Sequence, residues 1–408
     1  MTTTAAQAGL AVLKTIFEGD GATPQMRDFN PTLKLFEPST DDIEGGRDIV
    51  FPIQQQYQQG IGARTETQDL PEPGQGDYAK CDFTLTKLAF SVQITTDAWK
   101  KSVKKGMASF VNLVAESGTD VKGGFYRDQN WQLFGDGSGL RTTFNANQAA
   151  PVANVTIAVV STKGLFEGML IDIYTAGNNV PNSAGVLVTG IDPIGLTITL
   201  ASVDVAIATT DEIYRAGNRG NEILGLKGFV SDTTGPATVQ GITVANNSTW
   251  RSVLLTNGGT AREIERNLIE QAMRGGMNVD NKRPNVVIGG LIQAQKYAMM
   301  LVIKDEYNKA DKAGRITLDY GYETLKVGNK PLIEDPDCPD DKLYFLHTDT
   351  LKFWALDKVD FVPPPDGKGV WYRIPGKPFF RADGEYYCQF GGKRRNHHVM
   401  LGDLSTTL

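Results

Sequence analysis

The segment that most constrains the fold is residues 47–134, where a hairpin pattern leads directly into a helix pattern with no linker between them. Residues 48–57 and 81–94 are rich in β-branched and aromatic side chains that partly alternate with polar ones, which predicts two strands. Residues 59–77 between them are rich in glycine and proline and predict an exposed loop or a loosely paired tip. The arms and tip together could reach on the order of 40 Å. Two strands alone are marginally stable in water, so we expect the hairpin to rest on something else.

Residues 97–134 predict a long amphipathic helix. Its apolar face is marked at alternating spacings of four and three by Trp99, Val103, Met107, Phe110 and Val114. Several glycines interrupt the pattern, and we expect bends or a break near Gly118. The helix should end at the glycine-rich residues 135–139. A hairpin followed by a helix of roughly 55 Å suggests an architectural part rather than an enzyme.

The middle of the chain changes to short strand patterns. They lie at residues 155–160, 170–174, 185–191, 196–200 and 211–214, with glycines between them. This spacing is typical of a small barrel or sandwich, and we interpret it as a self-contained β insertion.

The rest of the chain is mixed. A capping box at residues 260–263 predicts a helix that ends near residue 276, and a second helix is expected at 291–302. Strands are expected at residues 284–290, 322–327, 343–347, 351–354, 370–374, 385–390 and 396–401. The predicted class is therefore α+β with several sheets.

Composition excludes some functions. With 408 residues the chain can form two or three domains, and its net charge of −6 argues against a protein coated in duplex nucleic acid. Its three cysteines lack a CxxC spacing, which favours neither a disulfide framework nor a zinc site and fits a reducing cytoplasm. No secretory signal and no apolar run of about eighteen residues occurs, so no membrane partner is expected.

Groups for catalysis are few. His397 and His398 are adjacent on a predicted strand and should point to opposite faces, and His347 is expected to be a core histidine. No HExxH, GxSxG or P-loop spacing is present. We therefore expect no catalytic residues, no cofactor and no metal.

Three further segments each have two interpretations. Residues 135–139 read as a turn or a phosphate-binding loop, although they follow a helix rather than precede one. Residues 335–341 read as an exposed acidic turn or a calcium site. Lys100, Lys101, Lys104 and Lys105 read as a solvated helix face or as a basic surface that lines a space holding nucleic acid.

The order of these parts resembles a tailed-bacteriophage major capsid protein of the Hong Kong 97-type fold. The shared features are a proline-broken N-terminal arm, a two-stranded extension, a long helix, an αβ domain and final strands. Residues 133–139 (LFGDGSG) and 225–230 (GLKGFV) also resemble the stretch that such proteins carry after their spine helix.

The resemblance implies a domain plan. It assigns 1–46 to an N-terminal arm, 47–96 to the extended loop hairpin, 97–150 to the spine helix and first part of the peripheral domain, 151–218 to an inserted β-barrel-like domain, 219–245 to a peripheral-domain connection, 246–363 to the axial domain and 364–408 to C-terminal strands of the peripheral domain. The inserted domain departs from the minimal fold. The hairpin would contact a neighbouring subunit through Arg64, Glu66, Asp69, Leu70 and Glu72.

The resemblance also implies partners and a location. The chain would form the pentamers and hexamers of an icosahedral shell, with a separate scaffolding protein, a portal, a possible decoration protein and packaged double-stranded DNA held by non-specific contacts. It would be found in the virion and assembled in the host bacterial cytoplasm.

Two alternatives remain. An encapsulin-like compartment would keep the fold and change the cargo, although encapsulins are usually shorter and lack the inserted domain. A carbohydrate-binding or adhesion module would need stacking aromatics, and the β-rich segment offers only Phe166, Tyr174 and Tyr214.

Overall fold

The computed structural model describes residues 30–97, 108–149, 152–203, 205–276, 283–309, 325–363 and 369–407. The chain divides into two units. The described residues of unit 1 lie mainly within Thr86–Asn130 and Ala355–Cys388, and unit 2 comprises Pro31–Leu85, Trp131–Trp354 and Gln389–Leu408.

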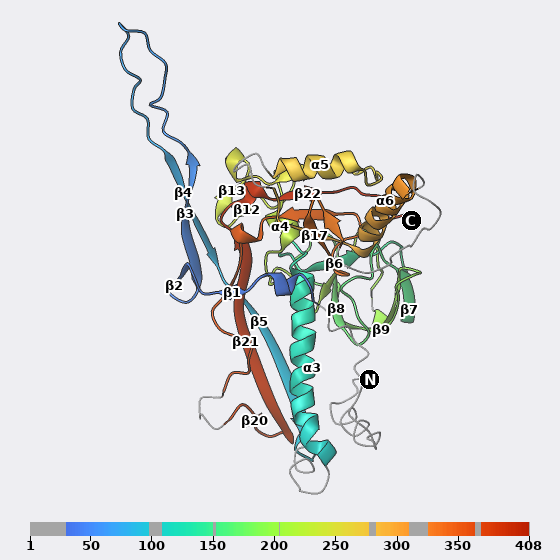
Figure 1. The fold of residues 1–408 in the computed structure, drawn as a ribbon. Coiled ribbons are helices and arrows are strands. Elements are labelled where there is room, and N and C mark those ends of the chain that lie inside the picture. Colours follow the sequence, from blue (N-terminus) through green and yellow to red (C-terminus); the bar gives the residue numbers. More distant parts are fainter. Residues whose placement is uncertain are drawn as a thin grey trace. The chain divides into compact units, whose positions relative to one another are not determined.

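Unit 1 combines one long helix with a pair of long antiparallel strands (Figure 1). Strand β5 (Thr86–Thr95) pairs with β21 (Phe379–Gly392) over ten residues. On the other side of β21, β20 (Tyr372–Arg373) pairs with Phe380 and Arg381. Alternate side chains of β5 are buried, as expected for a strand with one covered face: Leu88, Phe90, Val92 and Ile94.

Helix α3 (Ala108–Gln132) lies against this strand pair. The ring of Phe90 packs against Phe125 of α3 at 5.1 Å and against Phe361 at 5.2 Å between ring centroids. Phe90 also covers Gly384 on the paired strand, where a β-carbon would overlap its ring. Large aromatic side chains thus fill the space between helix and strands.

The described part of the predicted helix is continuous, so the expected break near Gly118 is wrong. Gly118 faces the ring of Phe361, and Gly123 and Gly124 face open space. The cost of about 1 kcal/mol for each helical glycine is therefore tolerated without a break. Lys100, Lys101, Lys104 and Lys105 lie outside the described residues.

Unit 2 begins with the hairpin. Strand β3 (Asp48–Gln56) pairs with β4 (Asp77–Thr84), and β2 (Ile43–Glu44) pairs with the start of β3. The strand expected over residues 81–94 is in fact two strands, because β4 ends at Thr84 and β5 begins at Thr86. Alternation continues through both strands, so periodicity could not show that the pairing partner changes at Leu85.

A barrel-like sheet follows, with its six antiparallel strands in the order β6-β11-β8-β9-β10-β7. They are β6 (Leu140–Thr143), β7 (Val152–Ala158), β8 (Leu170–Tyr174), β9 (Ser183–Asp192), β10 (Thr197–Val203) and β11 (Glu212–Arg215). A bridge between Phe144 and Val159 joins the segments that follow β6 and β7, the two edge strands. Inside lies a core that includes Val155, Ile157, Ile171, Ile173, Val188, Ile198, Leu200 and Ile213. The five short patterns in the sequence correspond to β7 through β11.

The second large sheet of unit 2 is mixed, with the order β14-β22-β18-β15-β17-β16. Its strands are β14 (Val253–Leu255), β15 (Val286–Gly289), β16 (Lys326–Val327), β17 (Lys330–Glu334), β18 (Leu343–Leu346) and β22 (Val399–Leu401). Helices α5 (Arg266–Gly275) and α6 (Leu291–Lys309) share a hydrophobic core with it.

The start of α5 differs from the prediction. The helix begins at Arg266 after an extended Glu265, and Thr260 lies in a turn where its N–H donates to the carbonyl of Asn257 at 3.2 Å. The sequence pattern of a capping box is therefore present at residues 260–263 without the helix.

Short elements complete the described chain: η1 (Leu33–Leu35), β1 (Pro38–Ser39), α4 (Leu226–Phe229), β12 (Thr238–Val239), β13 (Ile242–Thr243), η2 (Ser248–Trp250), η3 (Thr348–Thr350), β19 (Leu351–Ala355) and η4 (Arg395–His397). No helix in the described ranges combines the length and apolar character needed to cross a bilayer.

Candidate functional site

The hairpin of β3 and β4 is held at its base by aromatic packing. Phe51 of β3 stacks on Trp354 with 6.0 Å between ring centroids, and Phe83 of β4 meets the same indole edge-on at 5.4 Å. Ile49 and Cys81 are fully buried at this end. The base of the hairpin is therefore part of the core of unit 2.

Hydrogen bonds and ion pairs add to this anchor. The N–H of Asp82 donates to the carbonyl of Gln240 at 3.3 Å. The next residue, Gly241, has a φ of 79°, and a β-carbon there would lie 2.6 Å from the Asp82 carbonyl oxygen, so no side chain fits. Asp42, whose carbonyl accepts the Val50 N–H at 3.0 Å, forms an ion pair with Lys393 at 2.8 Å.

The distal part, residues 57–76, differs from the base. It carries no strand, and each of its residues is exposed or only partly buried. Three large apolar side chains are almost fully in solvent: Tyr57 (84% exposed), Ile61 (86%) and Leu70 (85%). We call residues 57–76 the hairpin tip.

The predicted contact residues all lie exposed in the hairpin tip: Arg64, Glu66, Asp69, Leu70 and Glu72. Arg64 shapes the tip, because its Nε donates to the carbonyl of Asp69 at 2.8 Å. Leu70 supplies apolar surface, and the three carboxylates give the tip an excess of negative charge. The sequence interpretation missed Tyr57 and Ile61, which lie among glutamines and glycines and show no periodic pattern.

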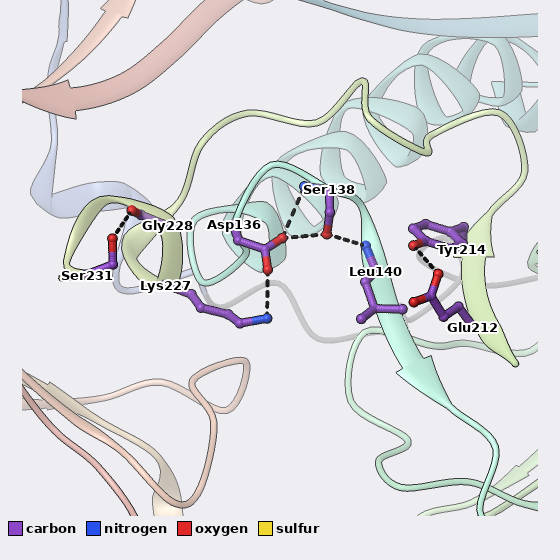
Figure 2. Close-up of polar contacts among 8 residues, drawn as sticks. All are labelled: Asp136, Ser138, Leu140, Glu212, Tyr214, Lys227, Gly228 and Ser231. Carbon is purple, nitrogen blue, oxygen red and sulfur yellow. Dashed lines mark hydrogen bonds and ion pairs between the residues drawn. The ribbon is translucent and has the colours of Figure 1, made fainter. Parts of the chain in front are cut away.

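Figure 2 shows the loop at residues 135–139, which follows α3. The Asp136 carboxylate accepts hydrogen bonds from the backbone N–H (3.1 Å) and the hydroxyl of Ser138 and pairs with Lys227 at 2.7 Å. Burial by itself raises the pKa of Asp136, but the hydrogen bonds from Lys227 and Ser138 outweigh it and hold the pKa below its usual value. The Asp136 carboxylate takes the Ser138 N–H and adds a negative charge to the loop, which fits a turn and opposes phosphate binding.

The two short motifs of the resemblance contact each other in the structure. The N–H of Leu226 donates to the carbonyl of Leu133 at 2.6 Å, and the N–H of Gly228 donates to Gly135 at 3.3 Å. A β-carbon on Gly225 would lie 2.6 Å from the Leu133 carbonyl oxygen and 2.7 Å from that of Gly135. Glycine at 225 is therefore required by close packing of the two backbones.

The three histidines form a buried cluster, which corrects the expectation that His397 and His398 point apart on a strand. His397 lies in η4 and His398 caps it. The His347 ring lies 5.2 Å from that of His397 and 6.4 Å from that of His398, and the His347 N–H donates to His398 Nδ1 at 3.3 Å. No group of three or more potential ligands in the described residues could hold a metal ion.

The acidic residues 335–341 form a turn, but the expectation that this turn is exposed is wrong, because Asp335, Asp337 and Cys338 are buried. The fully buried Asp335 carboxylate accepts a hydrogen bond of 2.6 Å from the Thr32 hydroxyl and one of 2.9 Å from the Asp337 N–H. Asp340 pairs with Lys163 at 2.7 Å. These carboxylates bind protein donors and are not arranged around a cation.

The barrel offers poor material for a sugar-stacking surface. Tyr174 and Tyr214 are buried and meet edge-to-face at 5.2 Å, with the Arg219 guanidinium 4.3 Å from the Tyr174 ring centre. Their faces are thus used within the barrel, which leaves Phe166 as the one aromatic of the three that is partly exposed.

Comparison with known proteins gives similarity in structure only. No protein-family model and no curated protein matches the sequence. The cyanophage A-1(L) capsid protein matches with a TM-score of 0.57 and 12% identity, over 94% of this chain and 97% of that chain. The capsid of an empty GTA particle matches over 99% of this chain and 100% of that chain, with a TM-score of 0.49 and 9% identity. An encapsulin complex from Synechococcus elongatus matches over 98% of this chain and 96% of that chain, with a TM-score of 0.45 and 9% identity.

The cyanophage match spans nearly the whole of both chains, so the similarity includes the order of elements and not one shared motif. The chain therefore has the fold of a bacteriophage capsid protein, as the resemblance in its sequence predicted.

Proposed function

We propose that this chain is a major capsid protein that assembles in many copies into the icosahedral head of a tailed double-stranded DNA bacteriophage. The observation that carries the proposal is the hairpin tip, where Tyr57, Ile61 and Leu70 are 84–86% exposed. A tip whose large apolar side chains are uncovered gains stability by covering a neighbour. In a closed shell many modest contacts of this kind add up.

The Hong Kong 97-type domain plan belongs to this proposal. The hairpin within 47–96 serves as the extended loop and α3 as the spine helix. The barrel strands within 151–218, joined by β6 from the preceding segment, serve as an inserted domain, and the mixed-sheet strands within 246–363, joined by β22 from the C-terminal segment, serve as the axial domain. Pentamers and hexamers form the shell, with a separate scaffolding protein, a portal and a possible decoration protein. The lysines at 100, 101, 104 and 105 are proposed to face the packaged DNA.

Deletion of residues 59–76 tests the role of the tip. Because the base of the hairpin is anchored at Trp354, the shortened chain should fold with an unchanged circular dichroism spectrum but form few or no shells. Negative-stain microscopy and size-exclusion chromatography measure assembly. The matched control shortens the barrel turn at residues 193–195, which should leave assembly intact. Normal shells from the tip deletion would contradict the wrapping role.

The encapsulin-like alternative differs in cargo. Shells purified from the native source should contain double-stranded DNA if the chain is a phage coat and a packaged protein if it is a compartment. Nuclease digestion followed by nucleic-acid and protein analysis of opened shells separates the two. The proposed role is structural and assigns no catalytic residue.

A further inference from the structure

One hollow lies on the barrel surface. It has a volume of about 300 Å³ and is lined by Phe166, Gly168, Met169, Leu170, Arg215 and Ala216. This is at the small end of the range for ligand sites and suits one or two side chains better than an extended cofactor. We call it the barrel hollow.

The backbone around the barrel hollow is well supported. The N–H of Gly168 donates to Val188 at 2.9 Å, and the N–H of Ala216 donates to Leu170 at 3.0 Å. Gly168 has a φ of 86°, and the direction of its absent β-carbon is open space. The barrel hollow therefore lies where β8 begins and the neighbouring strand β11 ends.

Its chemistry is apolar with one positive charge. Leu170 is 50% exposed and lies opposite Leu187, itself 36% exposed, on the neighbouring strand. Arg215 is the one charged residue among the six lining residues, and its guanidinium lies 5.8 Å from the Phe166 ring centre. The barrel hollow therefore suits an apolar side chain flanked by carboxylates.

The hairpin tip carries such a sequence. Leu70 is 85% exposed and is flanked by Asp69 and Glu72, while Pro71 restricts the backbone between them. Within residues 57–76 there are three carboxylates and one arginine, a net charge of −2. Leu70 is mostly in solvent, so it does not occupy the barrel hollow of its own chain.

We infer that the Asp69–Leu70–Glu72 stretch of one copy docks into the barrel hollow of a second copy, with Leu70 against Leu170 and a carboxylate beside Arg215. The inference rests on the proposed shell function and names the partner surface. Tip and barrel hollow are different surfaces of one chain, so their contact is heterologous, and such a contact forms a ring when the rotation between copies closes. Rings of five and six copies are what a capsid shell requires.

A cysteine pair tests the contact. Leu70→Cys and Leu170→Cys in one chain should give, on mild oxidation of assembled shells, a ladder of disulfide-linked multimers on a non-reducing gel. The three native cysteines are buried and free, and burial raises the pKa of Cys81 to about 12. We therefore expect them to form few disulfide cross-links of their own. The matched control pairs Leu70→Cys with Ile194→Cys, which is 95% exposed on the same barrel but outside the barrel hollow. Leu70→Cys alone controls for disulfides between two tips, and Leu170→Cys alone controls for disulfides between two barrel hollows.

Charge variants give an independent readout. Arg215→Glu should lower the yield of shells, and adding Glu72→Arg to the same chain should restore it. Glu167 is exposed next to Phe166 and has the same sign as the tip, so Glu167→Gln should increase cross-linking. If Arg215→Glu fails to fold, the cysteine pair still tests whether the tip docks into the barrel hollow.

The outcomes separate two failures. Shells that form without a Leu70–Leu170 ladder overturn the docking site and leave the shell function standing. A chain that stays monomeric under all assembly conditions overturns the proposed function itself. A ladder equal to that of the Ile194 control would mean unspecific collision and also overturns the docking site.

Discussion

Arg395 is buried in unit 2 and connects its own segment to two others, at residues 229–231 and at Trp250. Its Nε donates to the Phe229 carbonyl at 2.8 Å, one terminal nitrogen donates to Trp250 at 2.9 Å, and the other donates to the carbonyl and hydroxyl of Ser231 at 2.9 Å. Burial lowers the pKa of the guanidinium to about 10, so the group is still charged at neutral pH. A buried charge is tolerated here because four acceptors surround it.

Arg395→Lys should lower the free energy of unfolding by about 3 kcal/mol, because an ammonium group cannot reach acceptors spread around a planar fork and leaves carbonyls unsatisfied. Urea denaturation measures the change. The adjacent Arg394 is exposed, so Arg394→Lys is the matched control and should change stability by less than about 0.5 kcal/mol. Equal stability of the two variants would contradict the role assigned to Arg395.

The histidine cluster predicts a pH dependence. Burial, together with the neighbouring His347, His397 and Arg395, holds the pKa of His398 well below the usual histidine value of 6.5. The unfolded chain then binds more protons than the folded chain below that pH, so stability is complete above pH 6.5 and falls as the pH falls through it. The expected loss is about 1.4 kcal/mol per pH unit for each proton excluded by the fold.

The urea midpoint should therefore be lower at pH 5.5 than at pH 7.5. This window lies above the usual titration of aspartate, so carboxylates contribute little. His398→Asn should reduce the difference between the two midpoints. Identical midpoints for the native chain would show that protonation of the histidine cluster does not lower the stability of the fold.

At the scale of elements, the hairpin combines a firm base with an unsupported tip. The aromatic contacts at Trp354 fix the base, whereas the tip has only local bonds such as those of Arg64 with Asp69 and of Thr65 with Gln68. Exposed loop tips of this kind are preferred sites of proteolysis.

Arg64 is the only lysine or arginine within residues 57–76, so trypsin has a single site in the tip. Unassembled subunits should be cut rapidly after Arg64, and assembled shells should be protected because a neighbour covers the tip. Mass spectrometry of timed digests measures this. Arg64→Gln is the control and should abolish the cut in both states. Equal cleavage of subunits and shells would mean that the tip stays uncovered.

Element prediction succeeded where periodicity is strong. Strands β7 to β11 of the barrel and helix α3 follow from alternating or helical spacing of apolar residues, whereas the short strand β6 was missed. The break expected at Gly118 did not occur, because Phe361 packs against the side of the helix where the glycine lies. Local propensity was overridden by a tertiary contact that the sequence pattern does not contain.

At the scale of the whole molecule, unit 2 links its two large sheets by polar contacts. Lys163, in the loop after β7, pairs with Asp340 at 2.7 Å and donates to the Cys338 carbonyl at 2.8 Å. The segment before the hairpin is fixed in the same unit through Thr32 and Asp335. Barrel, mixed sheet and hairpin base are thus connected through named side chains.

The sequence by itself determined the kinds of elements, their order and the resemblance to a capsid protein, because these depend on local spacing and on motif order. Only the tertiary structure decided that β5 leaves the hairpin to pair with β21, that residues 133–139 meet residues 225–230, and that three histidines gather in one buried cluster. Each of these joins residues far apart in the chain. Such partners are selected by packing and hydrogen bonding across the folded molecule, which a local pattern does not encode.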